Sequence, residues 1–504
     1  MITEKAVVLY RGSLKSCNYG CSYCPFSKHR GSGREYDRDR DQWFRFVESL
    51  LENGGKAPER STGAVMVVPY GEALIHDWYW QGLGRLTAGT SLDCAGAQTN
   101  LSFSVSRSVD LYREAGGQTG KLSLWATFHP EMTDVETFAD QCLRVRREGI
   151  RICAGAVGVP ENLESIRRLR QLLPRDMYLW INKMDGMERP YTVSERQEFE
   201  KIDPYFSREL AAVEADESRC RNRFFVESDG RVRRCNISRV LTENWYDRLP
   251  GQKSRMRAGC GRKRCSCYLA YGGREDVMNR ILFGSYPVFR IPRKMKAVFL
   301  DIEGTLIPRG ETEISSFAKR DLELLARQGT GLFFATTLPV REARKRCRAL
   351  WPLFSGGVFA GGAHVVLREE KGEKEVLYPM DRRWLRIMRE EGRNRRARVL
   401  AWERRGILYK ITLLRPRQLP WKEDEIREVS ENCDNRGEGQ VRVFAEDCCL
   451  QVVPYTASKA EGVKTLCLWL GISLSEAAAS GNSAEDEEML RITGNSDPFL
   501  SDDP

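Results

Sequence analysis

Three cysteines near the start of the chain have a type and spacing that suit metal chemistry. Cys17, Cys21 and Cys24 form a C-x3-C-x2-C series directly after the apolar run Ala6–Tyr10. Thiolates are the ligands of iron–sulfur clusters, and a [4Fe–4S] cluster normally takes four of them. Three thiolates would leave one iron open to a cofactor, whereas zinc needs a fourth donor, which His29 could supply. The spacing predicts a metal site, with a cluster and zinc as alternatives.

A second group of cysteines lies further along the chain, where glycines and basic residues are frequent. The sequence has 16 cysteines, and in a reducing compartment such a number favours metal binding over disulfides. Asp229-Gly230 is typical of a hairpin turn and lies inside this group. The candidate ligands are Cys220, Cys235, Cys260, Cys265 and Cys267. We expect them to bind a second metal centre, with a zinc knuckle as the alternative.

Alternating elements must position the first cysteines. Over the first ~200 residues, short apolar runs alternate with segments that have apolar residues at helical spacing. The predicted strands are Ala6–Tyr10, Ala64–Tyr70, Asp93–Thr99, Leu122–His129, Ile152–Val159 and Met177–Asn182. Strand–helix alternation predicts parallel strands joined by crossover helices. Six such units would form a partial (β/α)6 barrel of TIM-like type, with ligands at the carboxyl ends of its strands.

The chain is too long for one compact core, and its composition changes along its length. We expect an α/β protein with a partial barrel over residues 1–202, a small cysteine-rich domain over 203–286 and a linker over 287–296. A second α/β domain is expected over 297–504.

The first cysteine loop resembles the signature of the radical S-adenosylmethionine (radical SAM) superfamily. Tyr23 precedes Cys24, and the second strand ends in Tyr70-Gly71-Glu72, similar to the family's Gly-Gly-Glu motif. The resemblance implies a [4Fe–4S] cluster on Cys17, Cys21 and Cys24 that binds S-adenosylmethionine. It implies an electron donor such as flavodoxin or ferredoxin, and hydrogen abstraction from a peptide or small molecule. The residues expected to bind the cofactor are Tyr23, Gly71, Glu72, Asn100, Thr127 and Asn182.

The second cysteine group resembles the SPASM extension of radical SAM proteins, which carries auxiliary clusters. Its opening C-x9-G-x4-C element fits that pattern, but the closing C-x4-C-x-C element is shorter than the family's. The resemblance implies one auxiliary [4Fe–4S] cluster. The choice between Cys265 and Cys267 as its last ligand stays open.

The last 200 residues resemble the haloacid dehalogenase (HAD) superfamily, most of whose members are Mg²⁺-dependent phosphatases. The matching segments, in family order, begin with Asp301-Ile-Glu303 and continue with Thr336, Lys459 and the loop Gly481-Asn482-Ser-Ala-Glu-Asp486.

The HAD resemblance implies a Rossmann-like domain with an inserted cap at about 368–453, and it implies a role for each of these residues. Asp301 would attack phosphorus, and Glu303 would act as acid and base. Thr336 and Lys459 would bind the phosphoryl group, and Asp301, Asn482 and Asp486 would hold Mg²⁺. Relatives carry Asp where this chain has Asn482, which weakens the metal site because an amide brings no charge. A degenerate domain that only binds a phosphorylated ligand is the alternative.

Charge and hydropathy exclude other classes of protein. The net charge of +10 comes from 80 basic and 70 acidic residues, a mild bias for this length. We interpret the arginine-dense stretch Arg382–Arg405 as a solvated face interleaved with glutamates, so nucleic acid is not expected as a partner. No run is apolar enough to span a membrane and no leader is evident, so a cytoplasmic protein is expected.

Together these patterns predict a radical SAM enzyme fused to a HAD-type phosphatase or degenerate phosphatase. Two other hypotheses remain open. One is a zinc-binding, non-catalytic scaffold that binds nucleic acid. The other is a phosphatase preceded by a structural metal domain.

Overall fold

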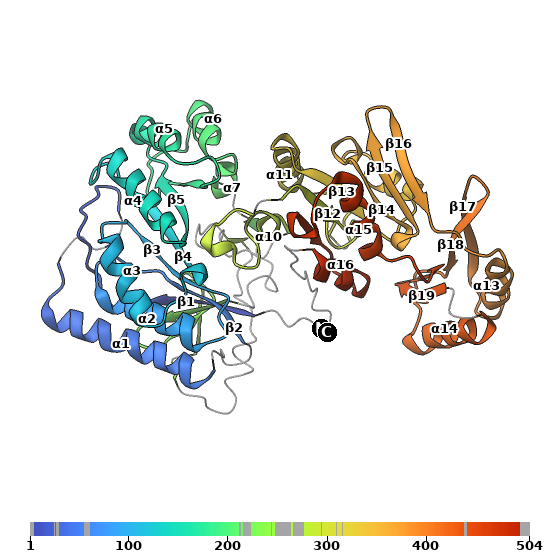
Figure 1. Cartoon of the computed structure of the whole chain (residues 1–504), viewed down its shortest axis with the longest axis horizontal. Helices are drawn as coiled ribbons and strands as arrows, with labels where there is room; N and C mark the ends of the chain where they lie inside the picture. Colours follow the sequence, from blue (N-terminus) through green and yellow to red (C-terminus); the bar gives the residue numbers. More distant parts are fainter. Residues whose placement is uncertain are drawn as a thin grey trace. The chain divides into compact units, whose positions relative to one another are not determined.

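The chain forms two compact units, Met1–Arg293 and Lys294–Pro504, which are described separately (Figure 1). The structure is a computed structural model. It describes residues 5–24, 26, 30–54, 61–210, 213–214, 223–242, 244–246, 264–265, 277–293, 295–308, 310–314, 316–437 and 441–493. Within these ranges, no helix has both the length and the apolar character needed to cross a bilayer.

A nine-stranded sheet organises the first unit, and six of its strands are parallel and adjacent in sequence order. They are β1 (Ala6–Arg11), β2 (Thr62–Val67), β3 (Cys94–Thr99), β4 (Leu122–Phe128), β5 (Arg151–Val157) and β6 (Leu179–Asn182). The six predicted strands and their parallel order are therefore confirmed. The helices between them are α1 (Gly33–Glu52), α2 (Asp77–Gly89), α3 (Val105–Glu114), α4 (Val135–Arg147) and α5 (Leu163–Leu172). These helices lie along one side of the strands (Figure 1).

Helix α1 shows how the local sequence produces these elements. The Ser32 hydroxyl accepts a hydrogen bond from the Glu35 amide, and the Glu35 carboxylate accepts one from the Ser32 amide. This capping box satisfies two amides at the start of the helix. The buried side chains recur at three- and four-residue spacing: Trp43, Phe46, Val47 and Leu50. That spacing places one apolar stripe against the sheet.

The opposite face of this sheet is filled by a later part of the same unit. Trp125 and Trp180 project from β4 and β6, and Val288 and Phe289 pack among them. Residues 287–296 were expected to form a linker. Instead, the short 3-10 helix η4 (Pro287–Phe289) is buried, because its apolar side chains fill the space in front of the tryptophans.

A hairpin extends the sheet at its other edge. Strand β8 (Arg223–Glu227) runs parallel to β1, and β9 (Val232–Arg233) and β10 (Val240–Thr242) follow it. Gly230 has a φ of +95°, so the predicted Asp229-Gly230 turn is confirmed. The other elements of the unit are α6 (Val193–Ile202), α7 (Phe206–Leu210), β7 (Val213–Glu214), β11 (Arg264–Cys265) and α10 (Val277–Phe283).

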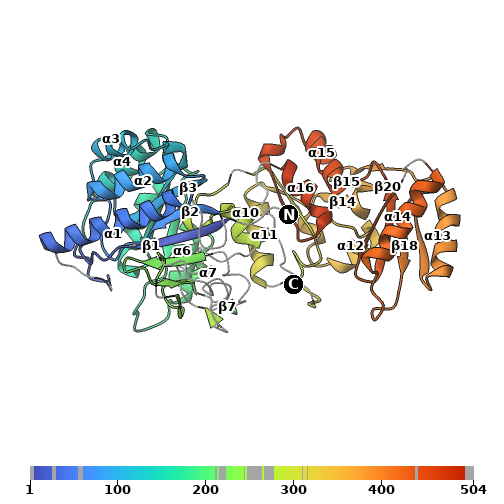
Figure 2. The same cartoon turned by 90° about the horizontal axis from the view of Figure 1, so that it is seen from below.

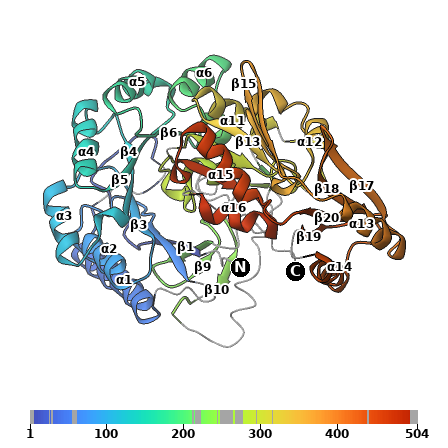
Figure 3. The same cartoon turned by 45° about the vertical axis from the view of Figure 1, so that its right-hand side comes forward.

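The second unit has a six-stranded core sheet in the order β16-β15-β14-β13-β12-β21. Its strands are β12 (Ala297–Leu300), β13 (Gly331–Ala335), β14 (Gly356–Phe359), β15 (His364–Glu369), β16 (Gly372–Leu377) and β21 (Ala477–Ser480). The four strands β14, β13, β12 and β21 are parallel, and β15 and β16 continue the sheet antiparallel. Its helices are α11 (Ser316–Arg327), α12 (Val340–Arg346), α15 (Lys459–Leu470) and α16 (Glu487–Ile492). Helix α15 contacts β14 and β15, and it is drawn in red in Figure 3.

A separate four-stranded antiparallel sheet forms the cap. Its strands are β17 (Arg398–Arg404), β18 (Ile407–Leu414), β20 (Cys449–Pro454) and β19 (Val441–Glu446), and its helices are α13 (Arg383–Asn394) and α14 (Glu423–Gly437). Both helices are labelled beside β18 in Figure 2. The cap was expected to begin at about residue 368. It begins after β16, because residues 364–377 form a hairpin of the core sheet.

Candidate functional sites

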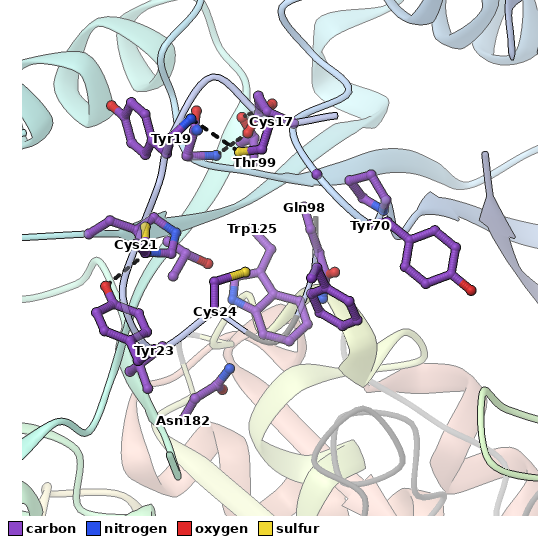
Figure 4. A pocket seen from close by; sticks show the side chains of 18 of the residues that line it. Cys17, Tyr19, Cys21, Tyr23, Cys24, Tyr70, Gln98, Thr99, Trp125 and Asn182 are labelled. Atoms are coloured by element: carbon purple, nitrogen blue, oxygen red, sulfur yellow. Dashed lines mark hydrogen bonds between the residues drawn. The ribbon is translucent and has the colours of Figure 1, made fainter. Parts of the chain in front are cut away.

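A cavity of about 190 Å³ lies at the carboxyl ends of the parallel strands of the first unit, and Cys17, Cys21 and Cys24 all line it. Figure 4 shows the three thiols around this cavity, with Trp125 and Asn182 beside them. The lining also includes every residue predicted to bind the cofactor: Tyr23, Gly71, Glu72, Asn100, Thr127 and Asn182. The structure therefore brings together residues that come from five separate parts of the sequence.

The cysteine loop is held against the end of β2 by backbone contact. The Glu72 amide donates to the Ser16 carbonyl over 3.1 Å. A Cβ atom on Gly71 would lie 1.8 Å from that same carbonyl oxygen. Gly71 was expected to admit the cofactor. Gly71 also allows the backbone next to Cys17 to pack closely against it. The motif alone does not indicate this role.

A buried aspartate on α1 fixes the start of the loop. Asp39 Oδ1 accepts a hydrogen bond from the Leu14 amide over 3.1 Å, and Oδ2 accepts one from the Tyr79 hydroxyl over 2.8 Å. Asp39 is completely buried, so these hydrogen bonds are protected from water. The loop entry is thus positioned by the first two helices as well as by the sheet.

Glu72 is the central acceptor of this site. Its carboxylate accepts hydrogen bonds from the Leu74 amide (3.0 Å), the Thr99 hydroxyl (2.8 Å) and the Asn100 amide (2.5 Å). Burial raises the pKa of Glu72 to about 7, and these three donors oppose the shift. A carboxylate has about four acceptor positions, so one position of Glu72 remains for a ligand.

Tyr23 and His129 form a neutral pair on the other side of the cavity. The Tyr23 hydroxyl lies 3.0 Å from His129 Nδ1. Burial lowers the pKa of His129 to about 4 and raises the pKa of Tyr23. Neither side chain carries a charge at neutral pH.

The thiols have the donor chemistry of a cluster site. Burial, followed by the neighbouring Cys24 and Cys17, raises the pKa of Cys21 to about 11, and burial also raises the pKa of Cys17. Among the described residues, no three Cys, His, Asp or Glu side chains converge on one point. Three thiols on one loop that face one cavity fit a cluster held by three cysteines, provided that the side chains turn towards a common centre. The alternative zinc donor, His29, lies outside the described residues.

Most of the second cysteine group lies outside the described residues, including Cys220, Cys260 and Cys267. Cys235 is half-buried after β9, and its amide donates to the Ser238 hydroxyl over 3.2 Å. The backbone of Cys265 belongs to β11, which pairs antiparallel with β7. The auxiliary cluster stays a prediction.

In the second unit, a buried lysine lies between two carboxylates. Asp301 directly follows β12, and Lys459 is the first residue of α15. Lys459 Nζ donates to Asp301 Oδ1 over 2.9 Å and to Asp486 Oδ1 over 2.7 Å. Burial raises the pKa of Asp301 and Lys459 opposes this shift, while the two carboxylates raise the pKa of Lys459. The three side chains form one compact charged centre at the carboxyl ends of the strands.

Asp486 was expected to compensate for Asn482 as a metal ligand, but both of its oxygens have protein partners. Oδ2 accepts hydrogen bonds from the Asn482 amide (3.0 Å) and from the Ser483 amide (2.9 Å). The Asn482 side chain lies against Gly304, where a Cβ would be 1.8 Å from Nδ2. In the described part of the chain, Oδ2 of Asp301 and the side-chain oxygen of Asn482 are candidate metal donors. That set fits Mg²⁺, which binds through one or two carboxylates, water and substrate phosphates.

The other two predicted catalytic residues lie at the same edge of the core sheet. Thr336 is buried after β13, and its hydroxyl accepts a hydrogen bond from the Leu338 amide over 3.1 Å. Glu303 is more open, with 55% of its side chain exposed and Arg346 at 3.9 Å. Burial, then Glu446, raises the pKa of Glu303.

The cap brings in polar residues that were not predicted from the sequence. Lys410 of β18 donates to the Thr337 carbonyl, and Glu446 of β19 accepts a hydrogen bond from the Thr337 hydroxyl over 2.7 Å. Burial lowers the pKa of Lys410 to about 8. The position of Lys410 within the apolar strand Ile407–Leu414 could have indicated this contact, because a lysine is rarely buried without a partner.

The fold and this charged centre define the second unit as an α/β domain of Rossmann type with an inserted cap. A family model described as haloacid dehalogenase-like hydrolase matches residues 414–496. The C-terminal part of the chain therefore contains a HAD-like hydrolase domain. A search of the curated proteins finds no matching sequence.

Several solved structures are similar to part of the chain. A haloacid dehalogenase-like hydrolase from Bacteroides thetaiotaomicron is 19% identical, with 40% of this chain and 86% of that chain covered and a TM-score of 0.34. One from B. subtilis is 14% identical, covering 40% and 87%, with a TM-score of 0.32. A protein from Thermotoga maritima is 16% identical, covering 40% and 84%, with a TM-score of 0.33.

Proposed function

We propose that the chain is a two-part enzyme in which a radical SAM unit precedes a phosphatase. The first unit would bind a [4Fe–4S] cluster through Cys17, Cys21 and Cys24, bind S-adenosylmethionine beside it, and abstract hydrogen from a peptide or small molecule. The observation that carries this proposal is the cavity at the strand ends, which joins three cysteines to all six residues expected to bind the cofactor.

The architecture around the cavity supports this function. We interpret β1 to β6, with helices on one face and buried aromatic side chains on the other, as the partial (β/α)6 barrel expected from the sequence. In such barrels ligands bind at the carboxyl ends of the strands. A cluster held by Cys17, Cys21 and Cys24 would supply one-electron reduction chemistry to bound S-adenosylmethionine.

The protein's own residues would orient the cofactor and exclude water. Glu72 has one acceptor position left, and an ammonium group at that position would gain a charge-assisted hydrogen bond. The carbonyl of Ser16 is held over Gly71, so the cysteine loop is fixed before the cofactor binds. Tyr23 and His129 close one side of the cavity without adding charge.

The second unit would hydrolyse a phosphate ester. Asp301 attacks phosphorus and forms an aspartyl-phosphate, and Lys459 offsets the charge that develops on the phosphoryl oxygens. The Thr336 hydroxyl donates to the same group. Glu303, at the open edge, protonates the leaving oxygen and then activates water. Asp301 and Asn482 would hold Mg²⁺, which supplies charge neutralisation on the phosphate.

Anaerobic purification with iron, sulfide and zinc analysis tests the first unit, followed by dithionite reduction with S-adenosylmethionine. We expect about eight irons per chain if the auxiliary cluster also forms, and about four fewer in a Cys17/Cys21/Cys24→Ala variant. Only the wild type should form 5′-deoxyadenosine. Stoichiometric zinc without cleavage of S-adenosylmethionine would exclude the radical function and favour the scaffold hypothesis.

Phosphate release with and without Mg²⁺ tests the second unit independently. Asp301→Asn should reduce turnover by at least ~10³-fold, as loss of a nucleophile does. The triple cysteine variant is the matched control and should keep this activity. If wild-type protein releases no phosphate but binds phosphorylated compounds, the domain is a degenerate phosphatase.

A further inference from the structure

The ten arginines between Arg382 and Arg405 fall into two groups of five. The first group is paired with glutamate or aspartate and contains Arg382, Arg383, Arg395, Arg404 and Arg405. The second group is exposed and, within the described part of the chain, forms no ion pair. It contains Arg386, Arg389, Arg393, Arg396 and Arg398, and we call it the arginine surface. The expected face of interleaved arginines and glutamates describes the first group, and the second group shares the outer face of α13 with one exposed glutamate, Glu390.

The arginine surface comprises three residues of α13 and two that follow the helix in sequence. Trp384 and Met388 lie on the inner face of α13 and are buried in the core of the cap. Arg386, Arg389 and Arg393 are spaced i, i+3 and i+7, so they share the outer face, and the first and last are ~10 Å apart along the axis. Arg396 and Arg398 continue the surface where the chain leaves the helix for β17.

The cap sheet separates this surface from the phosphatase centre. Helix α13 packs on one face of the sheet, with Leu408 and Ile411. Lys410 and Glu446 extend from the other face and contact Thr337 of the core. A partner bound on α13 would therefore leave access to Asp301 open. Both cap helices are visible in Figure 3.

We propose that the arginine surface binds the phosphate backbone of double-stranded nucleic acid. Five arginines with one glutamate, Glu390, beside them give this surface a net positive charge, and phosphates spaced along a backbone would neutralise it. Guanidinium groups also bind phosphate in a bidentate manner. This proposal does not depend on the two reactions proposed above.

The composition of the surface favours nucleic acid over other polyanions. Protein interfaces and amphipathic membrane helices are enriched in apolar contacts, whereas Trp384 and Met388 of α13 are buried in the cap. The outer face of α13 also presents no aromatic side chain on which single-stranded bases could stack. Recognition would use the backbone of a duplex and would be independent of sequence.

Salt-dependent binding of the full-length protein to a 20-base-pair DNA or RNA duplex tests the proposal. Five phosphate contacts predict a slope of log K against log salt of about −4.5, and hence ~500-fold weaker binding at 200 mM than at 50 mM salt. The variant Arg386/Arg389/Arg393→Gln should reduce the slope to about −2. The control variant Arg341/Lys345/Arg348→Gln removes three exposed cations near α12 and should keep the wild-type slope.

Two results would overturn the proposal. One is no duplex binding at 50 mM salt, including the case in which anionic vesicles or an acidic protein bind instead. The other is equal weakening by the two triple variants, which would show a general effect of net charge. Circular dichroism melting of each variant checks that folding is unchanged, and Arg386→Lys should retain most of the binding because it keeps the charge.

Discussion

The two candidate sites differ in how far their charges are balanced by the protein itself. In the second unit, Lys459 is already bonded to Asp301 and Asp486, so the charged centre is complete within the chain. In the first unit, Cys17 and Cys21 have raised pKa values and share a cavity without converging on one point. There the protein fixes the loop backbone through Gly71 and leaves the thiols available.

This difference reflects the ligands that each site would take. A phosphoryl group arrives with its own negative charge, so the site needs a preorganised cation. A metal cluster supplies positive charge itself, and its ligands have to lose protons to bind it. The first site is accordingly positioned by backbone contacts and by hydrogen bonds to the buried carboxylates of Asp39 and Glu72.

The largest expected effect comes from removing the central cation of the second unit. Lys459→Met would leave Asp301 and Asp486 buried without a counter-ion, and the free energy of unfolding should fall by ~3–5 kcal/mol. Denaturant unfolding measures this. Lys464→Met, which removes a half-exposed pair with Glu461, is the control and should change stability by less than ~0.5 kcal/mol. Equal effects would mean that the centre is not preorganised by charge.

The neutral Tyr23–His129 pair of the first site predicts an acid-sensitive contribution of His129 to stability. Because burial lowers its pKa from 6.5 to about 4, the unfolded state takes up a proton at a higher pH than the folded state. The contribution of His129 to stability is complete above pH 6.5 and is lost as the pH falls towards 4, by ~3 kcal/mol. Thermal unfolding of wild type and His129→Gln across this range should show the difference. Parallel curves would contradict the assignment of a buried neutral histidine.

Backbone positioning of the cysteine loop predicts a cost for any side chain at Gly71. Gly71→Ala places a Cβ 1.8 Å from the Ser16 carbonyl oxygen, and we expect a loss of ~1–3 kcal/mol in the stability of the first unit. Gly20→Ala is the matched control in the same loop, because no atom lies within 4 Å of its Cβ. Equal stability of the Gly71→Ala and Gly20→Ala variants would show that the contact between Gly71 and Ser16 does not hold the loop.

The smallest expected effect tests the weak metal site of the second unit. Asn482→Asp adds a carboxylate next to Asp301 and should tighten Mg²⁺ binding about tenfold, or ~1.4 kcal/mol. Calorimetric titration with Mg²⁺ measures this change. Unchanged affinity would indicate that residue 482 does not contact the metal.

The sequence predicted elements with a strong period and residues with unusual chemistry. The six parallel strands were predicted because their apolar runs alternate with amphipathic helices. Asp301 and Lys459 were predicted because their segments resemble the HAD motifs in family order. The packing of Val288 and Phe289 was not predictable, since an apolar pair beside proline looks the same in a linker and in a core. The hydrogen bonds of Asp486 to the amides of Asn482 and Ser483 depend on the conformation of the loop that contains all three residues. The role of Lys410 depends on its hydrogen bond to the Thr337 carbonyl of the core domain.

The bond between Asp301 and Lys459 joins residues 158 positions apart, and this separation constrains how the second unit can form during synthesis. The intervening cap contains hairpins of local pairing, which close early because short loops lose little entropy. The core sheet cannot be completed until β21 has been made. At ordinary translation rates of 5–20 residues per second, Lys459 is synthesised roughly 10–30 s after Asp301. During that time the edge of β12 that pairs with β21 has no partner strand, so the nascent chain must keep this edge from pairing with other strands.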